Sequence, residues 1–485
     1  MLFNSYAFLF LFLPITLLIY FGLNKGKWMR LSIGWLILIS LVYYGWFNPI
    51  YVSLIVGSLL FNFAIGTSLG RNGQTHFKRR CLLIMGIFGD LLLLGYFKYA
   101  DFFISTLNFL SHVQVPLLHV ALPIGISFFT FTQIAYLVDA HRGETERYPL
   151  PIYALFVSFF PYLLAGPIVH HREMAAQYNQ LDEKVLDYSN ITGGLYLFFI
   201  GLFKKVVLAD TLAGWASHGF DHATTLTLVE AWTASLSYTL QLYFDFSGYT
   251  DMALGSAQMF NIKLPINFNS PYRSLNIQDF WRRWHITLGR FIRDYIYVPL
   301  GGNRMSEVRT FVNLMVTFFL VGLWHGAGWT FIFWGSLHGG ALVIHRLWKK
   351  FNITMPGFLA WFITFNFVNA AWVFFRARTF GDAMKVLKGM IGLTGVVLPE
   401  ALSGRLGGLQ DYGVRFGRWM ENIGGDDKTI FLIGVCLLVA LIFRNSNEMT
   451  ARFKPNFPHL IFICIVAFMS ILWLGSHSEF LYFRF

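Results

Sequence analysis

Long apolar segments separated by short polar ones recur along the whole chain. A helix needs about 20 residues to cross the roughly 30 Å hydrocarbon core of a bilayer. Several segments are shorter or are interrupted by glycine and proline, so we expect some of them to tilt, break or re-enter, under a cover of protein or water. The segments are Phe3–Leu23, Leu31–Trp46, Tyr51–Gly66, Cys81–Phe97, Leu117–Val138, Pro151–Val169, Ile191–Leu208, Leu226–Phe244, Phe311–His325, Trp329–Ile344, Phe358–Phe375, Ile430–Phe443 and Leu460–Leu474. The pattern predicts an all-α integral membrane protein with about 11–14 membrane-embedded helices.

Composition agrees with this class. Only 13% of the 485 residues are charged and 56% are hydrophobic, whereas a soluble domain carries roughly 25% charged residues. The formal net charge of +12 comes from basic residues in short loops between apolar segments, which is typical of cytoplasmic loops and not of a nucleic-acid surface. The three cysteines are scattered and form neither a disulfide framework nor a zinc pattern. No repeat or low-complexity linker divides the chain, so residues 1–485 form a single membrane domain.

Loop charge also predicts an orientation. The loops at residues 24–30 and 70–80 are basic, while Asn48–Pro49 between them is uncharged. The first segment lacks a basic leader and a small-residue cleavage site, so it is predicted to be a retained helix with the N-terminus outside. Residues 376–428 form the longest extramembrane segment and mix both charge signs. Its charges leave its side open, whereas counting the spans from cytoplasmic His345–Lys350 would place it outside.

His325 lies inside an apolar run of 34 residues, Phe311–Ile344. As one helix this run would be about 51 Å long, so it must break, and Gly326–Gly328 is the expected place. His325 would then remain within the membrane, where loss of water favours the neutral imidazole that can accept a proton. An intramembrane ionisable group is usually functional. The alternative is a histidine that joins two helices by hydrogen bonds.

His338 follows His325 by 13 residues, about 20 Å along a continuous helix. The two histidines can therefore approach each other only if the chain folds back at the glycines. The chain contains neither an H-x-x-x-H nor an H-E-x-x-H pattern. We therefore predict no catalytic metal and no tightly bound cofactor.

The segment FWRRWHITLGRFIRDYIYVPLGGNR (Phe280–Arg304) is the most basic part of the chain. If it is one helix, several arginines share a face on which the phosphates of coenzyme A could bind, and two tryptophans could stack on a ligand or anchor the helix at the interface. Alternatively, the segment anchors an amphipathic helix on anionic lipid. The candidate donor-binding residues are Arg282, Arg283, Arg290, Arg293, Trp281 and Trp284.

Two carboxylates lie among aromatic residues in YFDFSGYTDMALG (Tyr243–Gly255), namely Asp245 and Asp251. Because buried charges need partners, we expect them to pair with arginines of the following basic segment. No phosphate-binding loop and no G-x-S-x-G nucleophile motif occurs, which argues against an ATPase or an α/β-hydrolase.

The combination of motifs resembles the membrane-bound O-acyltransferase family, in particular its bacterial branch. The matching stretches keep the family's order and are LPIGISFFTF (Leu122–Phe131), FFPYLLAGPI (Phe159–Ile168), YFDFSGYTDMALG, Phe280–Arg304, GLWHG (Gly322–Gly326) and WVFFRA (Trp372–Ala377). The core motifs fall within residues 122–345. Two departures are His170-His171-Arg172 after the A-G-P-I stretch and the sequence HITLG after Trp284.

The resemblance implies a many-helix bundle around a transmembrane tunnel in a bacterial inner membrane. It implies an essential catalytic histidine at His325 and a second functional polar residue at His285. Asp245, Asp251 and Asn303 are predicted as supporting polar residues. It also implies acetyl-CoA as a cytoplasmic donor and an acceptor outside, reached directly or through a periplasmic SGNH-type acetyltransferase partner. The hypothesis is O-acetylation of an exopolysaccharide such as alginate, or of peptidoglycan. Acyl transfer to a lipid and export of a glycan or an acyl donor are the alternatives.

Overall fold

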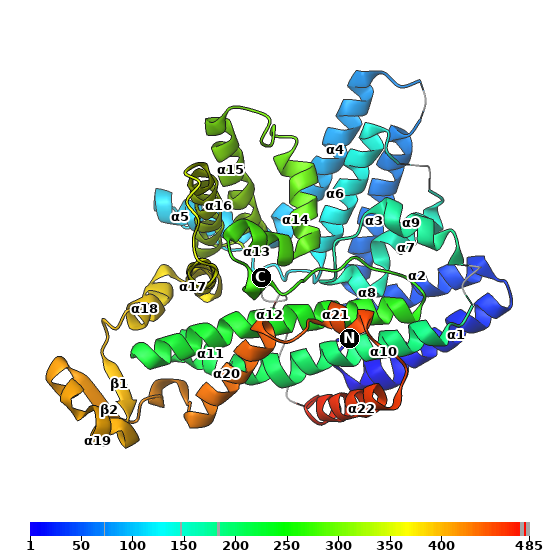
Figure 1. Cartoon of the computed structure of the whole chain (residues 1–485). Coiled ribbons are helices and arrows are strands. Elements are labelled where there is room, and N and C mark those ends of the chain that lie inside the picture. Colours follow the sequence, from blue (N-terminus) through cyan, green and yellow to red (C-terminus); the bar gives the residue numbers. More distant parts are fainter. Residues whose placement is uncertain (72, 146–147, 182–184, 476–479, 482–485) are drawn as a thin grey trace.

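The computed structural model describes residues 1–485 except 72, 146–147, 182–184, 476–479 and 482–485 (Figure 1). The α-helices are α1 (Leu13–Lys25), α2 (Met29–Gly45), α3 (Ile50–Leu69), α4 (His76–Leu94), α5 (Ala100–Ser111), α6 (Ile126–Arg142), α7 (Leu150–Ser158), α8 (Phe160–Leu163), α9 (His171–Tyr178), α10 (Tyr188–Phe203), α11 (Asp210–Ser217), α12 (Leu228–Met259), α13 (Ile277–Arg283), α14 (Ile286–Ile292), α15 (Glu307–His325), α16 (Trp329–Lys350), α17 (Gly357–Arg376), α18 (Phe380–Met390), α19 (Ser403–Leu406), α20 (Asp427–Leu441), α21 (Ser446–Ala451) and α22 (Phe457–Leu472). Short π-helical turns are η1 (Phe8–Phe12), η2 (Gly95–Tyr99), η4 (Lys204–Ala209), η5 (His218–His222) and η7 (Arg293–Tyr297). The all-α prediction is confirmed.

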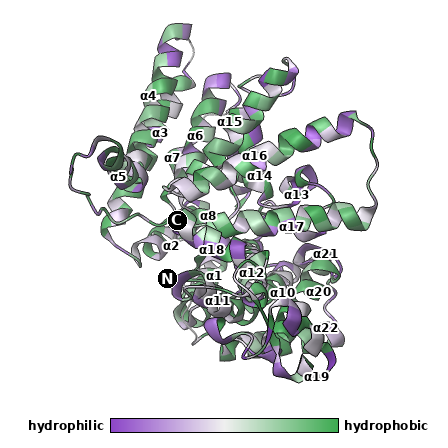
Figure 2. Ribbon diagram, turned by 90° about the vertical axis from the view of Figure 1, so that its left-hand side faces the viewer, coloured by the Kyte–Doolittle hydropathy of each residue, from purple (hydrophilic) through white to green (hydrophobic). Residues whose placement is uncertain are grey.

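Six helical stretches of the described chain are long and apolar enough to cross a membrane, and hydrophobic residues cover most of their length (Figure 2). They are Phe8–Lys25, Ile50–Leu69, His76–Ser111, Tyr188–His222, Glu307–His325 and Gly357–Arg376. Two shorter apolar helices, Met29–Gly45 and Phe457–Leu472, accompany them. The protein is therefore a multi-pass membrane protein in which several elements are shorter than a full span.

The helices form two groups that run in different directions. Helices α1, α10 and α12 lie side by side along one side of the molecule, and α3, α4, α6 and α15 stand at a steep angle to them (Figures 1 and 2). Helix α12 has 32 residues, nearly all of them buried. It begins with a capping box in which Thr227 and Glu230 satisfy each other's backbone amides. This long helix is the core element of the first group.

Glycines bring α10 and α12 into backbone contact. A Cβ atom added at Gly255 would lie 2.5 Å from the carbonyl oxygen of Gly194, and one added at Gly201 would lie 2.6 Å from that of Gly248. Small residues permit such close packing of helices inside membranes. We call these four residues the glycine seam. It fixes the two helices against each other without side chains between them.

The predicted pairing of Asp245 and Asp251 with arginines of the next segment is wrong. Lys205 Nζ lies 2.6 Å from Asp245, and Lys204 Nζ lies 2.7 Å from Asp251. The physical reason is that α10 continues into η4, which runs alongside α12. The two lysines of η4 therefore lie within ion-pair distance of the carboxylates of α12. Ser446 also donates to Asp251 at 2.9 Å. These buried pairs hold the two helices together.

Two of the element boundaries that differ from the predictions have a visible cause. Residues 117–125 are not helical, because Pro116 precedes them, Pro123 lies among them, and the Asp101 carboxylate accepts from the amides of Leu118 and His119. Helix α12 extends to Met259, beyond the predicted end at Phe244, because its polar residues are satisfied by the buried lysine pairs.

The segment 376–428 folds into short helices around a two-stranded sheet. Strands β1 (Val396–Pro399) and β2 (Val414–Gly417) run parallel, and Val396 faces Val414. Between the strands lie η8 (Glu400–Leu402), α19 and η9 (Gly407–Tyr412). Sequence analysis predicted this segment only as extramembrane, without its strands.

Candidate active site

The predicted break after His325 is confirmed. Helix α15 ends at His325, Gly326 and Gly328 are extended, and α16 begins at Trp329. The two helices then fold back on each other closely, since a Cβ atom added at Gly335 would lie 2.2 Å from the Phe318 carbonyl oxygen. This hairpin places His325 at its tip.

The imidazole of His325 is buried among aromatic rings. Only 4% of the surface of His325 is exposed. The ring centroids of Trp324, Trp334 and Phe375 lie 4.8, 5.1 and 5.1 Å from the centroid of the His325 ring. The interplanar angle with Trp334 is 90°. This cage restricts the orientations open to the imidazole.

Because the chain folds back, His338 joins the same aromatic cluster. The Trp334 ring lies 4.9 Å from the His338 ring while also contacting His325. Trp281 donates its indole N–H to His338 Nδ1 at 3.2 Å. His338 is thus held by hydrogen bonding from the basic segment.

His285 interrupts the basic segment, so this segment is not the single helix on which its arginines would share a face. The chain leaves α13 at Trp284, and His285 takes the left-handed conformation with φ +45° before α14 starts. The ring is buried, 4.8 Å from Phe246 and 6.1 Å from Trp324. His285 therefore reaches the cluster around His325 from a different element.

The tautomer of His285 follows from its neighbours. Asn267 Oδ1 accepts the backbone N–H of Thr287 at 3.1 Å, which fixes the amide orientation. The same oxygen lies 3.1 Å from His285 Nδ1, so Nδ1 carries the proton and donates. Nε2 is then the basic nitrogen of the neutral ring.

The arginines of the basic segment do not form the predicted common face. The break at His285 separates them, and most are neutralised locally: Arg283 pairs with Asp279 at 2.9 Å, Arg290 with Glu173 at 2.6 Å, and Arg293 with Asp294 at 2.7 Å. Arg282 is exposed and has no ion pair within the described part of the chain. Of the four arginines, Arg282 is therefore the one whose charge is most available to bind a polyanion.

Two further residues that were predicted for the functional site, Trp284 and Asn303, do not lie where that role requires. Trp284 is only 1% exposed and packs on Phe280 and Trp372, so its prediction as an interface anchor is wrong. Asn303 is exposed in the turn after η7 and is not brought to the buried histidines. Trp281 keeps a place in the cluster through its bond to His338.

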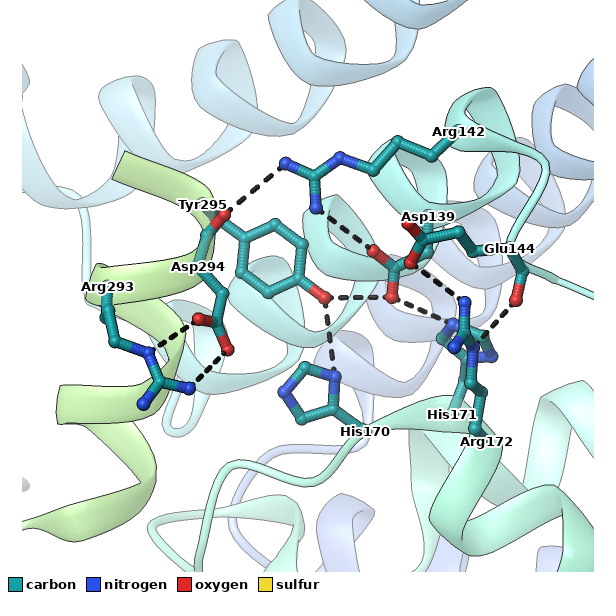
Figure 3. Close-up of polar contacts among 9 residues, drawn as sticks. All are labelled: Asp139, Arg142, Glu144, His170, His171, Arg172, Arg293, Asp294 and Tyr295. Carbon is teal, nitrogen blue, oxygen red and sulfur yellow. Dashed lines mark hydrogen bonds and ion pairs between the residues drawn. The ribbon is translucent and has the colours of Figure 1, made fainter. Parts of the chain in front are cut away.

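The unusual pair His170-His171 belongs to a polar cluster around Asp139 (Figure 3). His171 Nε2 donates to Asp139 at 2.9 Å, Tyr295 donates its hydroxyl to the same oxygen at 2.8 Å, and His170 Nδ1 lies 3.3 Å from that hydroxyl. Burial raises the pKa of the Asp139 carboxyl, but the hydrogen bonds from His171 and Tyr295 outweigh it and hold that pKa below its usual range. The cluster joins α6, α9 and η7.

Two adjoining cavities lie beside His325. A chamber of about 40 Å³ is bordered by His325, Trp324 and Ser127, and a wider pocket of about 300 Å³ is bordered by Asp101 and Gly326. Lys98 borders both. Sequence reasoning missed Lys98, although a single lysine directly after the apolar segment Cys81–Phe97 was a signal that could have identified it.

Comparisons with known proteins agree with the motifs. Residues 94–380 match the family model described as MBOAT, the membrane-bound O-acyltransferase family. The chain is 45% identical over its whole length, and over 98% of the relative, to a protein of Helicobacter pylori named peptidoglycan O-acetyltransferase. It is 42% identical to the probable alginate O-acetylase AlgI of Pseudomonas aeruginosa, over 84% of this chain and 78% of that protein. It is 29% identical to the teichoic acid D-alanyltransferase of Bacillus subtilis, over 56% and 73% respectively.

Proposed function

Because the chain belongs to the membrane-bound O-acyltransferase family, we propose that it transfers acetyl groups for the O-acetylation of a polysaccharide outside the cytoplasm. The observation that carries the proposal is the place of His325, buried at the tip of the α15–α16 hairpin and bordering the chamber. Relatives that cover most of the chain are named for O-acetylation of peptidoglycan and alginate. The match along the entire chain favours peptidoglycan as the acceptor.

In the proposed reaction His325 acts as a general base. It takes the proton of an acceptor hydroxyl, whose oxygen attacks the thioester carbonyl of acetyl-CoA. The tetrahedral intermediate collapses with cleavage of the C–S bond, and the imidazolium returns its proton to the departing thiolate. General bases contribute about 10²–10⁴-fold to rate. The first acceptor is the polysaccharide itself or a hydroxyl of a periplasmic acetyltransferase partner that passes the acetyl group on.

Acetyl-CoA reaches the chamber from the cytoplasmic side in this proposal. We assign its phosphates to Arg282, which is exposed on α13. Trp281 links α13 to the buried histidines through its bond to His338. The orientation rests on the basic loops, with the N-terminus and residues 376–428 outside a bacterial inner membrane. Labelling of single cysteines introduced at Asn48 and Gly408 in intact cells, against a cytoplasmic site at Gly73, tests that orientation.

One observation favours a lipid acceptor instead. An apolar groove of about 800 Å³ runs between α16 and α17, bordered by Leu337, Ala341 and Phe367. It could take an acyl chain. The residues that line this groove do not include His325 or any other residue that lines the chamber. The polysaccharide acceptor therefore remains the better-supported function.

The test uses the full chain in lipid vesicles with acetyl-labelled acetyl-CoA and peptidoglycan fragments, with and without a periplasmic acetyltransferase from the same cells. We expect His325→Ala to lose at least about 10²-fold of the label transfer while eluting in gel filtration like the wild type. The matched control is His459→Ala, a half-buried histidine on α22 that borders neither cavity beside His325. Equal transfer by His325→Ala and wild type would overturn the assignment, and label appearing in lipid would favour the alternative.

A further inference from the structure

Lys98 is a cation within a membrane-spanning stretch. It lies in η2, the π-helical turn between α4 and α5 in the span His76–Ser111. Of the carboxylates that the structure describes, none lies within ion-pair distance of its ammonium. Charged groups at such depth are costly and usually functional, and π-helical turns often occur at functional sites.

The ammonium of Lys98 is directed at the end of the helix that carries His325. It donates to the carbonyl oxygens of Trp324 at 2.5 Å and His325 at 3.1 Å, and it lies 3.5 Å from Ser127 Oγ. The last carbonyls of an α-helix have no partner within the helix, and they carry a partial negative charge. The lysine supplies both the hydrogen bonds and the opposite charge, so it caps α15.

The same side chain stands where the two cavities adjoin. Lys98 and Leu122 border both the 40 Å³ chamber and the 300 Å³ pocket. Gly326, which directly follows His325, borders the pocket. Movement of the last turn of α15 would therefore shift the imidazole relative to both cavities.

We propose that Lys98 is a positioning residue for His325: its ammonium fixes the carboxyl end of α15 and thereby holds the imidazole toward the chamber. The proposal rests on the proposed function, in which His325 is the base. Neither Gly326 nor Gly328 carries a side chain that could hold this end of the helix. Without the lysine, the last turn loses its cap and the ring loses its alignment. A misplacement of about 1 Å can cost about 10²-fold in rate.

The test compares Lys98→Met, Lys98→Gln and Lys98→Arg in the full chain in vesicles. We expect Lys98→Met to lower kcat by about 10²-fold with KM for acetyl-CoA nearly unchanged, because the lost interaction positions a catalytic group and does not bind substrate. Lys98→Arg, which keeps the charge and donors, should recover most of kcat. If Lys98→Met does not fold, Lys98→Gln takes its place, since its amide keeps N–H donors without the charge.

Hydrogen exchange supplies a readout that does not depend on turnover. We expect the amides of residues 323–326 to exchange faster in Lys98→Met and to return to wild-type rates in Lys98→Arg. The matched control is Lys385→Met. Lys385 also donates to two carbonyl oxygens at a helix end, those of Phe220 at 2.9 Å and Ala223 at 2.7 Å, but it borders neither cavity. Its loss should lower the melting temperature and leave kcat within about twofold of wild type.

The outcomes separate the two proposals. Wild-type kcat in Lys98→Met overturns the positioning role, and so does a lowered kcat with unchanged exchange at residues 323–326. A rise in KM matching the fall in kcat also overturns it, because Lys98 would then bind substrate. If the wild type transfers no acetyl group under any condition, the proposed function fails, and the exchange rates alone decide whether Lys98 holds the end of α15.

Discussion

Replacing Gly335 by alanine should disable the enzyme through one added methyl group. The new Cβ atom would lie 2.2 Å from the Phe318 carbonyl oxygen and 3.0 Å from the Gly322 Cα atom. Carbon contacts become favourable only near 3.5 Å, so α15 and α16 must separate by about 1 Å. Both obstacles are backbone atoms, which cannot move aside as a side chain can.

The separation acts directly on the catalytic hairpin. Overpacking of this kind costs about 1–3 kcal/mol of stability, and a shift of about 1 Å in the base costs about 10²-fold in rate. We therefore expect Gly335→Ala to show a lower melting temperature in detergent and about 10²-fold less acetyl transfer in vesicles. Thermal unfolding followed by gel filtration and label transfer from acetyl-CoA measure the two effects.

Gly340 provides the control on the same helix. A Cβ atom added there meets nothing within 4 Å, and alanine is favoured over glycine in a helix by about 1 kcal/mol. Gly340→Ala should therefore be as stable as the wild type or more so, with unchanged activity. The same melting temperature and transfer rate in both variants would refute the claim that backbone contact at Gly335 sets the position of His325.

Three further predictions concern charged groups. The pKa of Asp139 is held below its usual range, so its stabilising effect should be complete above about pH 4, the pKa region of an unfolded aspartate, and should fade as the pH falls further. The melting temperature of Asp139→Asn should therefore be lower than that of the wild type at pH 7 and should decline less between pH 7 and pH 3. Parallel melting curves for the two proteins would contradict this. Asp251→Asn should destabilise the fold by about 3–5 kcal/mol by leaving Lys204 buried without its carboxylate, and adding Lys204→Met should restore part of the melting temperature; no recovery would contradict the pairing. Arg282→Ala should raise KM for acetyl-CoA several-fold in low salt, whereas Arg290→Ala, whose charge Glu173 already neutralises, should not; equal effects would contradict the choice of Arg282.

The sequence was sufficient for features that depend on local pattern. The length of the apolar run around His325, set against bilayer thickness, predicted the break at Gly326, and the motif order predicted the family. The span limits were predictable to within a few residues wherever no proline or buried charge intervened. Each of these depends on residues close together in the chain.

Features that depend on tertiary contacts were not predictable. The partners of Asp251 lie on η4 and on α21. No local spacing in the sequence indicates that Asp251 pairs with a lysine 47 residues away and not with the nearest arginine. The left-handed conformation of His285 depends on Asn267, which fixes the ring from a loop. Lys98 was missed because its role becomes visible only when α15 ends beside it.

The glycine seam also bears on how the molecule responds to hydrostatic pressure. Backbones that meet without intervening side chains leave almost no free volume between α10 and α12, and close-packed regions compress little. Void volume lies instead in the cavities beside His325 and in the groove between α16 and α17, and pressure acts on voids. Compression should therefore distort the catalytic side before it disturbs the α10–α12 pair, so that catalysis declines reversibly at pressures where the helical scaffold is still intact.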